Sequence, residues 1–388
     1  MPACTRDSTR AQAKRAWNLG NGLDTFAFII HPIDAKRDVS RKFPFLGRVL
    51  SERQIDFFST FFPPVYISEI EGITSQATGK EIKGWFIACP YTPRRMMELP
   101  ERTVYRKIIQ TGRLAEKLGA QILGLGAFTS VVGDAGITIA NALDVPVTTG
   151  DSYTVMVAVD ALREAARVMD IPFKRSTVAV VGATGAIGQV CTELLADEAE
   201  RLYLIGRSQE KLEGLRDRLR VHARSELIVS AKMDVLESAQ LILTVTSAIH
   251  DVIRPEFLQP GSVVCDVARP RDVSAMVAAV RDDILVIDGG MVDVPGPVDF
   301  HFNFGFPPGK AYACMAETIA LALEGRFEDY TLGKHLTRQR VEEVDAMAKK
   351  HGFRLSGFRS FEREVTEGQI ETVRRNAKNA HGLRAARQ

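Results

Sequence analysis

The chain lacks the features of secreted, disulfide-bonded and membrane-spanning proteins. Its 388 residues include five cysteines, an odd number, and no CxxC pair. No apolar run approaches the ~18 residues that cross a bilayer, and the N-terminal stretch lacks the apolar core of a signal peptide. These absences predict a soluble, cytoplasmic protein whose thiols are free.

A large net charge and a metal-ligand pattern are also missing. Lys and Arg number 50 and Asp and Glu 48, so the formal net charge is +2 and composition does not predict nucleic acid as a partner. The seven histidines form no HxxxH pair. No spacing assembles a metal site or a Ser-His-Asp triad, and no metal ligands are predicted.

The strongest pattern present is the stretch Ser176–Arg207. A β-branched apolar run leads into Gly182, Gly185 and Gly188, which open an amphipathic helical pattern followed by a second apolar run. Such glycines permit a tight turn, close approach of a pyrophosphate and close helix–strand packing. The pattern predicts a dinucleotide-binding unit, although its spacing is GxxGxxG and a βαβ turn without ligand is the alternative.

The end of the second apolar run indicates which dinucleotide binds. Arg207 and Ser208 stand where an NAD-preferring enzyme usually carries Asp or Glu, and Lys211 follows one turn later. A guanidinium and a hydroxyl suit a 2′-phosphate, so the predicted cofactor is NADPH. The alternative is that Arg207 is only a solvated charge at a strand end.

Three later strands, at 239–245, 262–267 and 284–288, end in small or polar residues. A doubly wound sheet holds its ligand at such carboxyl ends, so these residues are expected near the nicotinamide. The predicted cofactor contacts are Gly182, Thr184, Gly185, Ala186, Ile187, Gly188, Arg207, Ser208, Thr246, Ser247 and Gly289.

Strands also alternate with helical patterns before the glycine turn, which predicts an α/β domain there. We therefore predict an α/β protein with an N-terminal α/β substrate domain, a central doubly wound Rossmann-type NADP-binding domain and a C-terminal helical segment. In this prediction Asp151 or Ser152 caps the helix at 153–168. The predicted ranges are a flexible extension at 1–24, the α/β substrate domain at 25–152, the Rossmann domain at 153–290, a helical domain at 291–355 and a charged extension at 356–388.

An unusual cluster of phenylalanines lies in the first domain, at Phe57, Phe58, Phe61 and Phe62, before Pro63-Pro64. Such density usually means core, but it also suits an apolar groove for a long substrate. Basic residues at 36–42 and 94–95 suit either an acidic protein partner or a solvated face.

Cys314 is the candidate reactive residue. It lies in the first turns of a predicted helix after Pro-Pro-Gly-Lys, where free N–H groups, the helix dipole, Lys310 or His301 can stabilise a thiolate. Cys89, at a strand end, is its competitor. From the residues alone a buried bystander is an equal alternative, because cysteine is commonly buried.

Four segments together resemble a known family. PGKAYACMAETIALALEG, GLGAFTSVV, VPVTTGDSYT and TVAVVGATGAIGQVC are similar to segments of the long-chain acyl-(acyl carrier protein) reductases of alkane-producing cyanobacteria, and the similarity covers about residues 25–355. The resemblance implies that NADPH reduces an acyl thioester to a fatty aldehyde. It implies that Cys314 carries the acyl group as a thioester, that Mg²⁺ activates, and that an aldehyde-consuming enzyme can be a partner.

Two questions stay open at this point. The extensions at both ends have no recognised counterpart, so the acyl donor is either acyl carrier protein or coenzyme A. The layout of an α/β domain before a GxxGxxG domain also fits a shikimate-dehydrogenase-like alcohol or amino-acid dehydrogenase, which would use a lysine–aspartate pair and no cysteine. A non-catalytic NADP-binding protein is a third reading.

Overall fold

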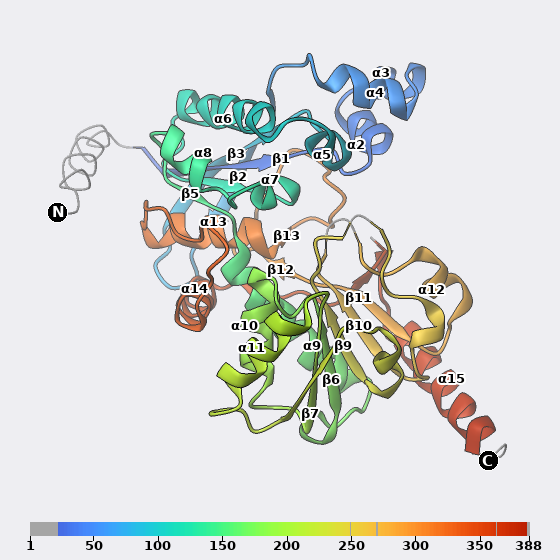
Figure 1. The fold of residues 1–388 in the computed structure, drawn as a ribbon. Coiled ribbons are helices and arrows are strands. Elements are labelled where there is room, and N and C mark those ends of the chain that lie inside the picture. The colour runs from blue at the N-terminus through green and yellow to red at the C-terminus, as the bar shows by residue number, and fades with distance from the viewer. Residues whose placement is uncertain (1–21, 249, 269–270, 362, 386–388) are drawn as a thin grey trace.

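The structure is a computed structural model that describes residues 22–248, 250–268, 271–361 and 363–385 (Figure 1). Residues 1–21, most of the predicted N-terminal extension, lie outside the described residues. Two sheets, one from each half of the chain, are joined through the buried helices α9 and α13. Within the described residues no helix combines the length and apolarity needed to cross a bilayer.

The N-terminal sheet has five strands in the order β2-β3-β1-β4-β5. β2 is antiparallel to β3, and the other pairings are parallel. Its alternating apolar residues bury both faces, because helices cover each side. The strands are β1 (Asp24–Ile30), β2 (Val65–Thr74), β3 (Glu81–Ala88), β4 (Leu123–Leu125) and β5 (Val147–Thr148).

Three short helices between β1 and β2 form a projection at one end of the molecule (Figure 1). They are α2 (Ala35–Lys42), α3 (Pro44–Val49) and α4 (Glu52–Ser59). Asp34 caps α2, and Ser51 with Gln54 forms a capping box on α4. The other helices of this half are α5 (Pro93–Glu98), α6 (Glu101–Leu118), α7 (Phe128–Val131) and α8 (Ile137–Ala142).

The second sheet has six parallel strands in the order β11-β10-β9-β6-β7-β8. The order reverses between β6 and β9, which is the doubly wound arrangement predicted from the glycine turn. The strands are β6 (Thr177–Val181), β7 (Arg201–Ile205), β8 (Glu226–Ser230), β9 (Leu241–Thr244), β10 (Val263–Asp266) and β11 (Leu285–Asp288). Its helices are α9 (Asp151–Val168), α10 (Ala186–Leu195), α11 (Gln209–Leu219) and α12 (Ala275–Val280), with 3-10 turns η1 (Phe173–Arg175), η2 (Asp234–Ser238) and η3 (Pro255–Phe257).

After β11 the chain returns to the N-terminal sheet. α13 (Ala313–Glu324) packs on β1, β4 and α9, and nearly all of its residues are buried. The α/β class and the C-terminal helices are confirmed, but this part also holds an antiparallel sheet, β13-β12-β14, that the helical pattern did not predict. Its elements are β12 (Met291–Asp293), β13 (Lys310–Tyr312), α14 (Arg338–His351), β14 (Arg354–Leu355), β15 (Arg359–Ser360), β16 (Arg363–Glu364) and α15 (Glu367–Ala385). The division at 152, 290 and 355 stays a proposal, since α13 shares the core of the first sheet.

Candidate active site

A cavity of about 1010 Å³ lies between the two sheets. The carboxyl ends of the parallel strands in both sheets open into it, including the residues that follow β4, β5, β6, β9 and β11. Ligands of open α/β sheets bind at such strand ends. One cavity therefore receives the candidate cofactor residues and the candidate nucleophile together.

The glycine turn after β6 has the shape that a pyrophosphate needs. Gly182 has φ +89°, and a Cβ on Gly188 would overlap with the carbonyl oxygen of Gly182. The cap residue of α10 is Gly185, which has no side chain to bond the first N–H groups of the helix, so these are available to an anion. Gly182, Thr184, Gly185, Ala186 and Ile187 line the cavity, whereas Gly188 packs behind the turn.

Arg207 and Ser208, predicted to bind the 2′-phosphate, occupy different positions. The exposed Arg207 lines the cavity and makes no ion pair within the described part of the chain. Ser208 is not among the cavity residues, and its side chain caps α11 by accepting from the N–H of Lys211. Arg207 is thus free to meet a phosphate, and Ser208 has a structural role.

Replacing Arg207 by alanine is expected to raise the KM for NADPH about 10- to 100-fold, because a charge-assisted hydrogen bond is lost. The KM for NADH should change little, because NADH has no 2′-phosphate. Initial rates with each cofactor measure the effect. Arg201→Ala is the matched control, since Arg201 lies at the opposite end of β7 and pairs with Glu226. An equal rise for both cofactors would contradict a contact with the 2′-phosphate.

Thr246, Ser247 and Gly289 all line the cavity. The Thr246 hydroxyl donates to Asp272, and the Thr246 N–H donates to the same buried carboxylate at 2.9 Å. Thr246 is therefore committed to holding its loop, and only Ser247 keeps an available hydroxyl. Gly289 leaves no space for a side chain, because a Cβ there would lie 2.6 Å from Cγ2 of Val267.

Cys314 is the second residue of α13 and lines the cavity half-buried. Burial, with the charge of nearby Asp151, raises the pKa of its thiol to about 12. Lys310 binds Asp293 and Ser356, and His301 lies near Glu71, so neither faces the thiol. The prediction that they stabilise a thiolate is wrong; the thiol requires a base.

The other described cysteines are fully buried and outside the cavity: Cys89, Cys191 and Cys265. Burial raises the pKa of Cys89 to about 11 and that of Cys191 to about 12. Cys89, the competitor at a strand end, has no access to a substrate in the cavity. Cys4 lies outside the described residues.

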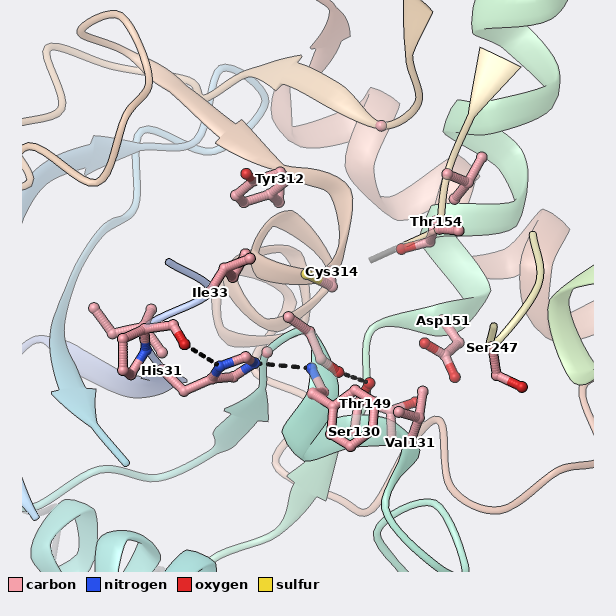
Figure 2. Close-up of a pocket in the computed structure, with 18 of the residues that line it drawn as sticks. His31, Ile33, Ser130, Val131, Thr149, Asp151, Thr154, Ser247, Tyr312 and Cys314 are labelled. Atoms are coloured by element: carbon pink, nitrogen blue, oxygen red, sulfur yellow. Dashed lines mark hydrogen bonds between the residues drawn. The ribbon is translucent and has the colours of Figure 1, made fainter. Parts of the chain in front are cut away.

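Asp151 lies inside α9 and faces the cavity. The prediction that Asp151 or Ser152 caps this helix is wrong, because the cap position is Gly150 and α9 begins at Asp151. Figure 2 shows Asp151, Thr149 and Ser247 around the space beside Cys314. Burial and the charge of Glu317 raise the pKa of Asp151 to about 7, although the Thr149 hydroxyl opposes the shift.

Thr149 also carries a hydroxyl that is buried in the cavity wall. Within the described residues Oγ1 has no hydrogen bond of regular geometry. Leaving a buried hydroxyl without a regular hydrogen bond costs free energy. The Thr149 hydroxyl is therefore placed to donate to an atom of a bound ligand. The only signal in the sequence was a short strand ending in small hydroxyl residues.

Glu317 holds the elements around Cys314 together. This fully buried carboxyl accepts from the hydroxyls of Thr148 and Thr331 and from the N–H of Tyr153. Burial raises its pKa above the ordinary value. It thereby ties β5 and the start of α9 to α13, one turn after Cys314.

His31, at the end of β1, is also part of the wall. Its Nε2 accepts from the N–H of Phe128 at 2.9 Å, which holds the loop after β4 (Figure 2). Burial lowers the pKa of His31 to about 4, so the ring is neutral at physiological pH. Because Nε2 accepts from Phe128 and Nδ1 lies against the carbonyl oxygen of Pro32, both ring nitrogens are engaged in holding the loop.

The basic residues considered for a carrier protein are mostly partnered. Arg37 and Arg41 lie against Asp38, and Lys42 donates to the carbonyl of Ile67. Arg94 and Arg95 both bond Glu98. Among the described residues no group of three His, Cys, Asp or Glu is placed to hold a metal ion.

Six parallel strands, a glycine turn at the reversal of strand order and a shared cavity define an NAD(P)-dependent oxidoreductase. A family model described as shikimate / quinate 5-dehydrogenase matches residues 163–288, which are confined to the second sheet and its helices. Long-chain acyl-[acyl-carrier-protein] reductase of Synechococcus elongatus is 30% identical over 337 residues, covering 83% of this chain and 95% of that protein. The chain belongs to the long-chain acyl-[acyl-carrier-protein] reductase family.

Other similarities include a second curated protein and a solved structure. Aminotransferase PigE of Serratia sp. is 35% identical over 308 residues, which are 78% of this chain and 36% of PigE. The chain therefore spans about a third of that protein. The solved structure of L-tryptophan dehydrogenase from Nostoc punctiforme matches at 12% identity and a TM-score of 0.40, covering 92% of this chain and 88% of that one.

Proposed function

We propose that this protein reduces a long-chain acyl thioester of acyl carrier protein or coenzyme A to a fatty aldehyde, with NADPH and a thioester intermediate on Cys314. The observation that supports this most directly is the single cavity that holds Cys314 and the glycine turn. The cavity continues between β1, β2 and the inner side of α2–α4. Charged side chains of α2 line part of it, and the following apolar side chains suit an acyl chain: Phe28, Ile30, Leu46, Leu50, Ile55, Phe62, Val65 and Ile67.

Acyl transfer requires that the Cys314 thiol lose its proton. In our proposal the ionised Asp151 accepts this proton while Sγ attacks the carbonyl carbon of the donor thioester. The bond between that carbon and the donor sulfur breaks, and Asp151 returns the proton to the departing sulfur. Thr149, whose hydroxyl has no regular partner in the described residues, donates to the carbonyl oxygen as negative charge develops there.

When bound at the glycine turn, NADPH supplies the hydride that reduces the acyl carbonyl. The chain's own contribution is to release the product: Cys314 Sγ leaves the carbon and takes one proton through Asp151. Ser247, on the nucleotide side of the cavity, can orient the reacting end of the cofactor. Activation by Mg²⁺ stays a prediction.

The product has a definable successor reaction. An aldehyde is the carbonyl substrate that amination requires, and one relative is named an aminotransferase. The family resemblance implies an enzyme that consumes the aldehyde. We propose that this enzyme converts the aldehyde to an amine.

Mass spectrometry of the intact protein, mixed with a long-chain acyl thioester without NADPH, tests the proposal. We expect a mass gain of one acyl group that maps to Cys314 and is discharged as aldehyde when NADPH is added. Absence of acylation in a protein that binds NADPH would overturn it. Turnover of small polyols that survives thiol alkylation would instead favour the shikimate-dehydrogenase-like alternative.

Asp151→Asn is expected to lower the acylation rate at pH 8 about 100-fold and to remove its dependence on pH near 7. In the unmodified protein the carboxyl, with its pKa of about 7, is ionised only above that pH, so acylation should rise as pH increases through 7. Quenched-flow acylation across this range measures both effects.

Thermal unfolding separates this role from a structural one. The pKa of Asp151 is raised from an ordinary 3.8. Ionisation of this carboxyl therefore lowers the free energy of unfolding by its full amount above pH 7, and has no effect at a pH far below 3.8. Asp151→Asn should therefore raise the Tm at pH 8 and leave it unchanged at low pH. A variant with a lower Tm and an unaltered pH profile would assign Asp151 to structure alone.

A further inference from the structure

The projection formed by α2–α4 exposes an unusual number of large apolar side chains. Phe45 is 73% exposed and Phe61 71%, and Val49, Phe57 and Phe58 are exposed with them. We call these five residues the aromatic cap. Of the phenylalanine cluster that was expected in the core or in a groove, Phe57, Phe58 and Phe61 are exposed, and Phe62 lines the cavity.

Three phenylalanines of the aromatic cap, in and just after α4, form a cluster. The ring of Phe57 contacts those of Phe58 and Phe61 edge to face, with centroids 5.5 and 5.8 Å apart. Phe45 and Val49 lie one helical turn apart on α3. None of the five lines the cavity, so the acyl site does not account for their exposure.

Unpaired cations accompany these apolar side chains. Lys36, Arg48 and Arg53 are exposed and make no ion pair within the described residues. Of the acids in the same segment, Asp38 pairs with Arg41, whereas the exposed Glu52 makes no ion pair within the described residues. Residues 34–61 hold six Lys and Arg against four Asp and Glu, so the charge around the aromatic cap is net positive.

We propose that the aromatic cap docks this protein on the surface of an anionic lipid bilayer. Exposed aromatic and aliphatic side chains beside lysine and arginine are the composition of helices that lie in the membrane interface. The cations face anionic headgroups while the rings enter the boundary with the acyl region. The place of α2–α4 at an end of the molecule leaves this surface open to a flat bilayer (Figure 1).

The position of the cavity favours a bilayer, rather than another protein, as the docking partner. Leu46, Leu50 and Ile55, on the inner side of the same helices, line the apolar part of the cavity. A docked projection would bring that part next to lipid, into which a long-chain aldehyde partitions. The release of aldehyde into lipid rests on the proposed function, whereas the docking surface itself does not.

Co-sedimentation of the full chain with vesicles, without substrate or NADPH, tests the docking. We expect binding to vesicles of phosphatidylglycerol and phosphatidylcholine, little binding to phosphatidylcholine alone, and weakening as salt increases. Phe45→Ser/Phe61→Ser should reduce the affinity at least 10-fold. Arg48→Gln/Arg53→Gln should reduce both the affinity and its salt dependence.

Val221→Ser/Val280→Ser is the matched control, because it removes comparably exposed apolar side chains from the second sheet's helices and loops. NADPH binding and a preserved Tm show that each variant is folded. Equal binding by the cap variants and the control, or no binding by any of them, would overturn the proposal. A dimer that forms without vesicles and dissociates in Phe45→Ser/Phe61→Ser would also overturn it, assigning the aromatic cap to a second copy of the chain.

Discussion

Replacing Cys314 by alanine is expected to abolish aldehyde formation, with a loss of at least roughly 10³-fold, while NADPH still binds. The thiol is the one described cysteine that lines the cavity, and it lies with Asp151 at the strand ends. Alanine keeps the helix and removes only the group that forms the thioester. The measurement is aldehyde formation by gas chromatography, with NADPH binding followed by fluorescence.

Cys89→Ala is the matched control for this loss. Cys89 is fully buried outside the cavity, so its replacement should cost some stability and leave the rate constant intact. Acylation should be absent from Cys314→Ala and present in Cys89→Ala. An unchanged rate in Cys314→Ala would remove the covalent mechanism and leave only the nucleotide site.

Replacing Gly150 by alanine is expected to slow acylation about 100-fold, because it displaces the nucleophile. Gly150 has φ +78°, and a Cβ there would overlap with Cα and Cβ of Cys314 and lie 2.6 Å from its carbonyl oxygen. α13 cannot yield, since Glu317 ties it to β5 and α9. We also expect a loss of about 2–5 kcal/mol in the free energy of unfolding from the clash and the left-handed backbone.

Gly119→Ala separates the two causes. Gly119 has φ +88° at the end of α6, but a Cβ there would meet no atom within 4 Å. It therefore carries only the cost of the left-handed conformation, roughly 1–2 kcal/mol, and should leave acylation unchanged. If denaturant unfolding and acylation rates were alike in the two variants, the contact between Gly150 and Cys314 would have no role in placing the thiol.

Several predictions made from the sequence depended on patterns within one short segment. The glycine turn with its flanking strands predicted the doubly wound sheet, and the structure confirms the strand order. A helix with Cys314 in its first turns was predicted after Pro-Pro-Gly-Lys, and Cys314 is the second residue of α13. In contrast, the phenylalanine segment was misjudged, because one apolar run can face a core, a cavity or solvent.

The glycine turn and the helix that carries Cys314 could be predicted from local patterns, because glycine spacing and apolar periodicity act over neighbouring residues. That Asp151 and Thr149 face Cys314, and that Lys310 and His301 do not, depends on how distant elements pack. These contacts join β5 and α9 to α13 through bonds such as that from Thr148 to Glu317, 169 residues apart in the chain. No local pattern records which distant strand end a helix will meet, since packing of the whole core selects it.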